Sequence, residues 1–313
     1  MRTILLGPQR FTIRATSALR SLGTEGPVGV VTAGWEERED ATGELDEALD
    51  HRSIHFRLYH RLNDVLAKDE TFAAAAVRHR DRQDELTALY RLRLEHTLDG
   101  VYAVQRRIPA HPARARRSLA LAAFHDAVAG VRRIDDWFLG QMAVLEAELA
   151  DAGGIERSGV IGWHREELKS DLARCSALVI PGGNVNTLVR VLRLFAIVIP
   201  QELPVLAWSA GAMALTERIA LFHDFGPAGS REAELLSRGV GRVRGVVAFP
   251  HPRRRLRLDD RERSSALALR FDPARCLLLD DGAWVEFGAD GALPADARIL
   301  GTDGLVHTEE VAG

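Results

Sequence analysis

A serine stands where an apolar strand is expected to turn into a helix. The segment Val205–Ala212 reads VLAWSAGA, with Ser209 directly after its apolar part. A strand–serine–helix turn holds a hydroxyl exposed beside the amides of a helix N-terminus, and small residues let strand and helix pass closely. The pattern favours a nucleophilic serine, and an ordinary structural turn is the alternative. Ala207 stands where the hydrolase elbow usually has glycine.

A glycine turn follows another expected strand, in the segment Val179–Asn184, which reads VIPGGN. Glycine lets the backbone approach a ligand closely and point its N–H groups at it. The amides of Gly183 and Ala210 can together form an oxyanion hole, usually the largest single contribution to catalysis of acyl transfer. The alternative is an ordinary glycine-rich turn between a strand and a helix.

A serine nucleophile needs a general base, and His251 is the histidine best placed to serve. It follows the apolar run Gly245–Phe249, so it is expected at the carboxyl end of a strand, where ligands bind in open α/β sheets. Asp224 is the candidate for orienting the imidazole, with an unassigned surface aspartate as the alternative. Arg253 and Arg255 are candidates for binding a substrate carboxylate, with a solvated or salt-bridged face as the alternative.

Short apolar runs near both ends of the chain predict the buried parallel strands that would position these residues. They are Thr3–Leu6, Val28–Thr32, Ala177–Ile180, Val205–Ala207, Gly245–Phe249 and Cys276–Leu279. Ala283–Phe287 and Leu300–His307 predict a terminal hairpin that completes the sheet. Residues 1–35 and 153–313 are therefore expected to form one α/β core.

The middle of the chain, residues 36–152, has no strand-like run and repeats its apolar residues at helical spacing. Three amphipathic helices are expected within residues 45–66, 86–101 and 124–149, with Pro109 and Pro112 between the last two. This insertion leaves the carboxyl edge of a strand, so we expect it near the site as a lid, a wall or an oligomer contact. Its apolar stripes favour a homodimer.

The composition narrows the class of protein. The 313 residues include 46% hydrophobic residues and two cysteines, and the net charge is −3. These values exclude whole-chain disorder and a disulfide framework, and they disfavour nucleic acid as the main partner. No apolar run reaches the ~18 residues of a membrane span, and no signal peptide is expected, so we expect no membrane partner and a cytoplasmic location.

A metal site is weighed at His51 and His55, which have the i, i+4 spacing that can hold zinc on a helix. The rest of a zinc motif is missing, so no metal is expected. Cys175 and Cys276 lie beside or within expected strands and are interpreted as packed apolar residues. Nothing in the sequence points to a nucleotide, and no cofactor is expected.

Several of these segments together resemble one family, that of aspartyl dipeptidase (peptidase E) and cyanophycinase. These are serine peptidases on a class I glutamine-amidotransferase-like fold. The segments are Trp208–Ala212, Pro181–Asn184, His251 with the arginines after it, and Leu279–Ala283. The resemblance covers about residues 1–35 and 153–313. It implies a three-layer, flavodoxin-like α/β fold with a parallel sheet, interrupted here by a large all-helical insertion.

The resemblance also implies roles for single residues. Ser209 would be the nucleophile, His251 the general base, and Gly183 and Ala210 the oxyanion amides. Asp224 lies 15 residues after Ser209 (224 − 209), where the dipeptidase branch has its acidic triad member.

The expected activity is hydrolysis of an amide bond in a dipeptide or short peptide, through an acyl-enzyme. A substrate with an acidic residue is favoured, with Asn184, Arg253 and Arg255 as substrate-binding residues. A different class of function stays open: a catalytically silent scaffold whose helical insertion binds a protein partner or a second copy of the chain.

Overall fold

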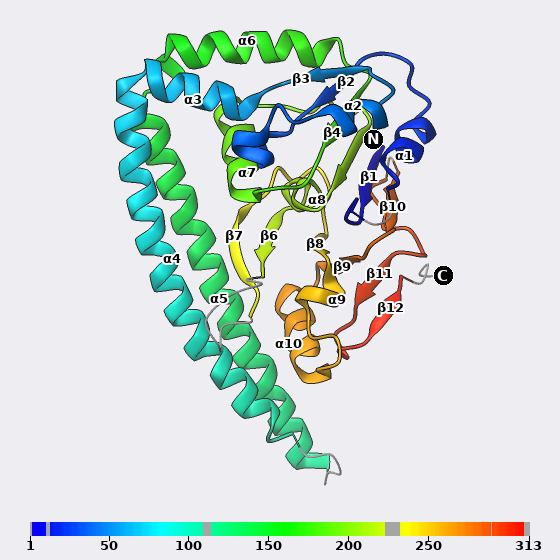
Figure 1. Ribbon diagram of the computed structural model, residues 1–313. Coiled ribbons are helices and arrows are strands. Elements are labelled where there is room, and N and C mark those ends of the chain that lie inside the picture. Colours follow the sequence, from blue (N-terminus) through cyan, green and yellow to red (C-terminus); the bar gives the residue numbers. More distant parts are fainter. Residues whose placement is uncertain (1, 11–12, 109–113, 223–231, 289, 310–313) are drawn as a thin grey trace.

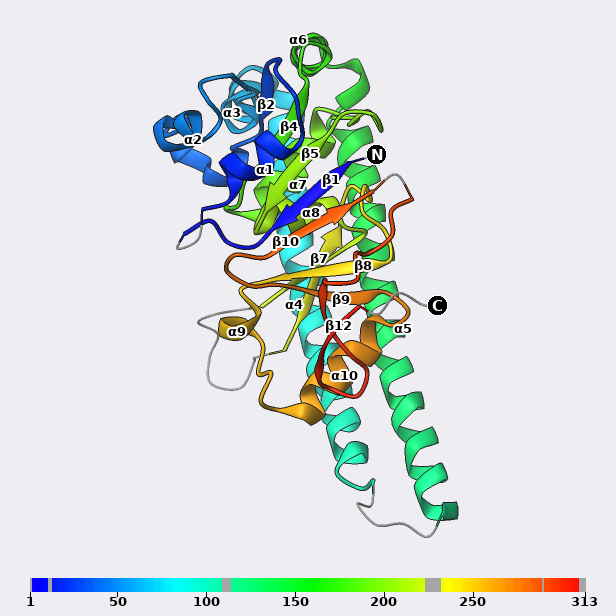
Figure 2. The same ribbon diagram turned by 90° about the vertical axis from the view of Figure 1, so that its right-hand side faces the viewer.

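A mostly parallel six-stranded sheet forms the centre of the computed structural model (Figures 1 and 2), which describes residues 2–10, 13–108, 114–222, 232–288 and 290–309. The strand order is β10-β1-β5-β4-β2-β3. The strands are β1 (Thr3–Leu6), β2 (Val28–Val30), β3 (Ser53–His55), β4 (Ala177–Ile180), β5 (Val205–Trp208) and β10 (Trp284–Phe287). Neighbouring strands are parallel except β10, which is antiparallel to β1. The predicted α/β class with a parallel sheet is confirmed.

Helices cover both faces of this sheet, because successive side chains of a strand point to opposite faces. On one face, Ile4, Leu6 and Val30 pack against helices α1 (Ala15–Ser21) and α2 (Gly43–Ala48). On the other face, Leu5, Leu178 and Ala207 pack against four helices. These are α3 (Leu58–Lys68), α6 (Gly159–Ala173), α7 (Val185–Leu194) and α8 (Ala210–Leu215).

A second sheet of four strands, in the order β12-β11-β9-β8, lies below the first in Figure 1. Its strands are β8 (Val246–Pro250), β9 (Arg275–Leu279), β11 (Arg298–Leu300) and β12 (Val306–Thr308). Beside it are the two-stranded ribbon β6 (Arg218–Leu221) and β7 (Glu234–Arg238) and the helices α9 (Pro252–Arg255) and α10 (Arg261–Phe271).

The predicted terminal hairpin is wrong in its pairing. Residues 284–287 form β10 and join β1 at the edge of the six-stranded sheet. Residues 298–308 form their own hairpin, β11–β12, in the second sheet. The apolar pattern marks where a strand lies, but the contact that chooses its partner is long-range.

The middle of the chain is mostly helical, but one part of the prediction there is wrong. The stretch 45–66, expected as one helix, is α2, then β3, then α3. The first helix ends because Asp50 and His51 both have φ of 54°, and β3 then pairs in parallel with β2. His51 and His55 therefore do not lie on one helix, and His55 contacts Asp46 instead, with Nε2 2.9 Å from Oδ1.

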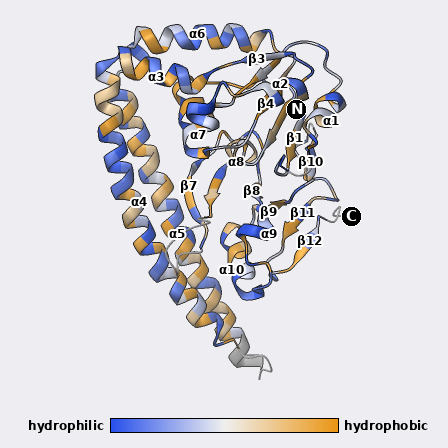
Figure 3. Cartoon of the chain, viewed as in Figure 1, coloured by the Kyte–Doolittle hydropathy of each residue, from blue (hydrophilic) through white to orange (hydrophobic). Residues whose placement is uncertain are grey.

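The other two predicted helices are confirmed inside a long antiparallel hairpin of α4 (Glu70–Gln105) and α5 (Arg114–Ala152), along one side of the molecule. Figure 3 shows apolar and polar residues alternating along both helices, as an amphipathic pair requires. The 3-10 turn η2 (Ile155–Arg157) follows the hairpin, and another, η1 (Ala33–Arg38), lies between β2 and α2. Pro109 and Pro112, the predicted break, lie outside the described residues.

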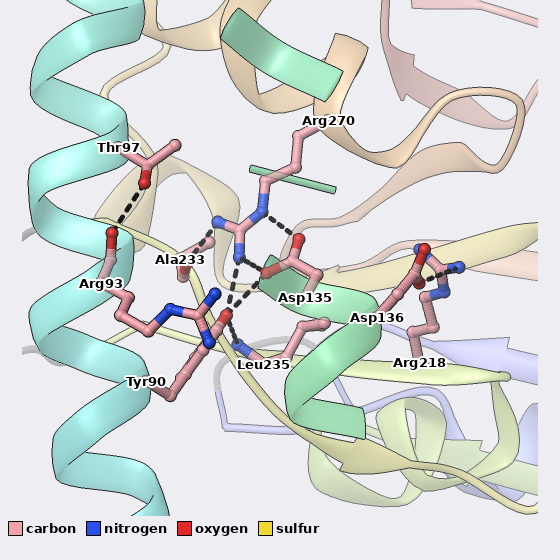
Figure 4. Close-up of polar contacts among 9 residues, drawn as sticks. All are labelled: Tyr90, Arg93, Thr97, Asp135, Asp136, Arg218, Ala233, Leu235 and Arg270. Atoms are coloured by element: carbon pink, nitrogen blue, oxygen red, sulfur yellow. Dashed lines mark hydrogen bonds and ion pairs between the residues drawn. The ribbon is translucent and has the colours of Figure 1, made fainter. Parts of the chain in front are cut away.

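A buried ion pair and its hydrogen bonds join this hairpin to helix α10 and strand β7, which lie beside the second sheet (Figure 4). Arg270 of α10 donates from Nε to Asp135 Oδ2 and from Nη2 to Asp135 Oδ1, both over 2.6 Å. Tyr90 of α4 donates its hydroxyl to the same carboxylate over 2.8 Å and accepts the N–H of Leu235 in β7 over 3.1 Å. Both charged side chains are almost fully buried. The hairpin thus shares its core with the α/β part of the chain.

Candidate active site

Ser209 occupies the turn between β5 and α8, with φ of 51° and ψ of −119°. A residue other than glycine rarely adopts this conformation, which costs roughly 1–3 kcal/mol and persists only where the surroundings impose it. Here β5 and all of α8 are buried, while Ser209 itself is partly accessible. The predicted strand–serine–helix turn is thus present in the structure, and it is strained.

Two glycines allow the two turns to touch. A Cβ on Gly211 would lie 2.0 Å from the carbonyl oxygen of Ile180, and a Cβ on Gly182 would lie 2.9 Å from Ser209 Cβ and 3.2 Å from its Oγ. The turn after β4 therefore packs directly against the serine turn after β5. The small residues noted in the sequence are required by this contact.

Gly183, the predicted oxyanion residue, is fixed by a third turn. Its φ is 122°, and a Cβ there would lie 2.2 Å from the carbonyl oxygen of Gly34. The N–H of Asn184 donates to the same carbonyl oxygen over 2.6 Å. Ala210, the other predicted oxyanion residue, follows Ser209 and begins α8. The carboxyl ends of β2, β4 and β5 thus meet at the serine.

Asn184, predicted to bind substrate, caps helix α7. Its side-chain oxygen accepts the N–H groups of Asn186 and Thr187 over 3.0 and 3.3 Å. Its Nδ2 donates to Glu36 Oε1 over 2.9 Å. Asn184 is exposed, so its position at the edge of the site is compatible with either role.

Glu36 is a functional candidate that the sequence analysis missed. Its Oε1 also accepts the hydroxyl of Thr187 over 2.6 Å, so the carboxylate lies at the N-terminus of α7, next to the glycine turn. Its φ of 55° and ψ of −122° nearly equal those of Ser209. The available signal was its place just after β2, at the carboxyl edge of the sheet, where ligands of α/β proteins bind.

His251 follows β8, a strand of the second sheet. Leu6, the last residue of β1, is in register with Trp208, so Gly7 and Ser209 follow two neighbouring parallel strands. The N–H of Gly7 donates to the carbonyl oxygen of Ala283, and the N–H of His251 to that of Leu279 (3.0 and 3.2 Å). Helix α8 packs on β8. The segment 279–283 therefore joins the residue after β1 to His251.

His251 lines a cavity of about 600 Å³ whose lining does not include Ser209. Five arginines line this cavity: Arg10, Arg14, Arg253, Arg254 and Arg298. Its acidic side is Asp280, Asp281 and Asp296, and Asp280 forms ion pairs with Arg298 and with Arg253, the latter over 3.6 Å. The cavity is therefore basic and lies against the candidate base.

The two arginines predicted to bind substrate lie apart. Arg253 is on the cavity of His251, whereas Arg255 lines a different, smaller cavity with Phe222, Leu256 and Arg263. Successive positions on the short helix α9 point in different directions, so a run of arginines does not converge on one site. Asp224, the predicted acidic triad member, lies outside the described residues.

The remaining candidates for chemistry that the sequence offered are the cysteines and a metal site. Burial raises the pKa of Cys175 to about 11 and that of Cys276 to about 12, so both thiols stay protonated at neutral pH. Within the described ranges, no group of three or more His, Cys, Asp or Glu side chains is arranged to hold a metal ion. Over the same ranges, no helix is long and apolar enough to cross a membrane.

Comparison with models of known protein families and with curated protein sequences finds no match to this chain.

Proposed function

We propose that the chain is a serine hydrolase that cleaves an amide bond in a dipeptide or short peptide through an acyl-enzyme. The observation that carries the proposal is the strained Ser209 turn, packed against the glycine turn Gly182–Gly183. Backbone strain of this kind clusters at active sites, where it presents a side chain in one fixed position. A structural turn could relax this strain by using glycine at position 209.

The proposed reaction uses groups at this edge of the sheet. Ser209 Oγ attacks the carbonyl carbon while His251 takes its proton, and the amides of Gly183 and Ala210 donate to the developing oxyanion. The C–N bond then breaks as His251 returns the proton to the leaving amine, and water hydrolyses the ester by the same path. Asp224 stays the proposed residue that orients the imidazole.

The cavity beside His251 supports a substrate with an acidic group. Its five arginines exceed its three aspartates, so the lining carries a net positive charge that would attract a carboxylate of the substrate. Arg253, the more exposed of the two arginines that pair with Asp280, is the proposed partner of this carboxylate. Asn184 follows the glycine turn beside the serine, does not line this cavity, and would contact another part of a short peptide.

The finer fold assignment is also a proposal: a flavodoxin-like, class I glutamine-amidotransferase-like core. The parallel order β1-β5-β4-β2, the serine turn after β5 and helices on both faces support it.

A second candidate function is supported by the α4–α5 hairpin. Its helices extend beyond the core (Figure 1) and expose Leu89, Leu92 and Leu119, the last with 74% of its surface accessible. Exposed apolar side chains on a protruding element favour self-association as a homodimer. If the chain is a catalytically silent scaffold, self-association through the hairpin would be its only role. Light scattering of wild type and of a Leu89→Glu, Leu92→Glu variant would test the contact: a dimer that dissociates in the variant supports it, and a monomeric wild type rejects it.

Peptide hydrolysis tests the proposed enzyme. Purified chain would be incubated with dipeptides that carry an N-terminal Asp, Leu or Lys, and the released amines measured. We expect hydrolysis, fastest for the Asp peptide, that is lost in Ser209→Ala and kept in Ser176→Ala, which removes an exposed hydroxyl far from the turn. Hydrolysis that survives Ser209→Ala rejects the proposal, and so does the lack of any hydrolysis.

A further inference from the structure

A second cavity, of about 260 Å³, lies between the helical hairpin and helix α7. Helix α4 contributes Phe72, His79 and Gln83 to its lining, and α5 contributes residues between Met142 and Ala150. Helix α7 lines the other side from Asn186 to Leu194. None of the residues proposed for catalysis lines this cavity, so it is a separate place in the fold.

The charges in the lining do not balance. Arg165 pairs with Glu156 over 2.9 Å, and Arg193 pairs with Glu146. These two pairs use both acidic residues of the lining, and the third arginine, Arg190, is left over. Among the residues that the structure describes, none gives Arg190 a hydrogen bond or an ion pair, and its Nε is buried.

A guanidinium without a counter-charge in such a position is costly. Burial, together with the neighbouring charge of Arg80, lowers the pKa of Arg190. His79 adds no second positive charge, because burial lowers the pKa of its imidazole, and its Nδ1 lies 3.2 Å from the carbonyl oxygen of Leu145. A partly buried cation normally finds a carboxylate, and here the cavity supplies the space for one.

The rest of the lining is mostly apolar, and Gln83, Asn186 and Ser237 are its uncharged polar residues. Phe72, Met142, Leu149, Ile155, Val189 and Leu194 face the same space. A ligand that matches both Arg190 and the apolar side chains carries a single negative charge at one end and hydrocarbon at the other. The ligand is small, because the cavity volume of about 260 Å³ lies just below the ~300–1,000 Å³ typical of ligand pockets.

We propose that this cavity binds a small monocarboxylate with an apolar tail, whose carboxylate pairs with Arg190 and whose tail packs against Met142, Leu149 and Val189. A larger anion such as a phosphate dianion fits less well, since the described lining leaves a single positive charge to be matched. The site lies along α7, whose N-terminus carries the cap Asn184 of the candidate active site. The proposal does not depend on the proposed hydrolase.

Calorimetric titration of the full chain with hexanoate tests the site, with acetate as the head alone and hexanol as the tail alone. We expect hexanoate to bind wild type at least about tenfold more tightly than either fragment, which is about 1.4 kcal/mol. Binding should weaken by at least about tenfold in Arg190→Gln and be partly kept in Arg190→Lys. The matched control Arg133→Gln, an exposed arginine on α5 outside the cavity, should bind as wild type.

Two results would overturn the proposal. One is a wild-type chain that shows no heat of binding with hexanoate at millimolar concentration. The other is a folded Arg190→Gln variant, checked by circular dichroism, that binds hexanoate as tightly as wild type. If the Gln variant does not fold, the comparison of hexanoate with hexanol on wild type decides alone, because equal affinities mean that no cation takes part.

Discussion

Gly182 and Ser209 lie so close that residue 182 has no room for a side chain. A Cβ on Gly182 would lie 2.9 Å from Ser209 Cβ and 3.2 Å from Oγ, both tighter than ordinary van der Waals contact. The first residue of the glycine turn therefore forms a wall beside the serine hydroxyl. Substitutions at 182 should act on the reactivity of residue 209.

Replacing Gly182 with alanine is expected to displace Ser209 and lower the rate of peptide hydrolysis at least about tenfold, because misplacing a reacting group by ~1 Å can cost about a hundredfold. Gly162→Ala is the matched control, since a Cβ on this helical glycine meets nothing within 4 Å. That control should keep the rate and gain up to about 1 kcal/mol of stability. Equal rates in the two variants would mean that the wall has no part in the chemistry.

Strain at Ser209 should appear as a stability difference between two variants that both lack the hydroxyl. Ser209→Ala keeps a Cβ at φ of 51°, whereas Ser209→Gly removes the steric cost of that conformation. We expect the glycine variant to unfold in urea with a free energy about 1 kcal/mol higher than that of the alanine variant. An alanine variant as stable as the glycine variant would show that the turn stores no strain.

Asp135 should be a large determinant of stability through its pair with Arg270. Asp135→Ala leaves a buried guanidinium without its carboxylate and is expected to cost about 3–5 kcal/mol in urea unfolding. The neighbouring Asp136 is exposed and pairs with Arg218 over 3.4 Å, so Asp136→Ala should cost less than about 1 kcal/mol (Figure 4). Similar losses in the two variants would contradict the role given to burial.

His164 should make the fold sensitive to acid. Arg61 Nη1 lies 2.9 Å from Nδ1, and Asp64 Oδ2 lies 3.0 Å from Nε2. A guanidinium can only donate, so Nδ1 accepts, Nε2–H donates, and the ring is neutral. Burial accordingly lowers the pKa of His164 below its ordinary value, and the Arg61 charge acts in the same direction.

The sign of the effect follows from proton uptake. Below an ordinary histidine pKa of about 6.5, the unfolded chain binds a proton at this residue that the folded chain does not bind. The free energy of unfolding should therefore fall as the pH drops from about 7.5 to 5.5, and His164→Gln should lose less over this range. Exposed His96 provides the control, because His96→Gln should lose as much as wild type. Identical slopes in all three proteins would contradict the neutral ring.

Local patterns in the sequence were enough for most of the central sheet. Buried parallel strands are continuous apolar runs, which is why β1, β4 and β5 could be predicted. Strand β3 has only Ile54 between two polar residues, so its pattern is indistinguishable from a helix or loop. The partner of β10 could not be predicted either, because pairing with β1 is decided by a contact across almost the whole chain.

The candidate site, too, could be predicted from the sequence only where its contacts are local. The turns at Ser209 and Gly182–Gly183 are local and were visible as strand–turn–helix patterns. Gly34 and Glu36 contact Asn184 across about 150 residues of sequence, so no local spacing of residues could predict these contacts. Arg253 and Arg255 line different cavities because of how the four-residue helix α9 is oriented, and the sequence alone does not give that orientation.

Covalent labelling with a fluorophosphonate, followed by mass spectrometry of the digested chain, is the decisive experiment for the proposed nucleophile. We predict one adduct, on the peptide that contains Ser209, with labelling abolished in Ser209→Ala, strongly slowed in His251→Ala and unchanged in Ser176→Ala. A folded wild-type chain that stays unlabelled, or that carries the adduct on another residue, would contradict the assignment of Ser209 as an activated nucleophile.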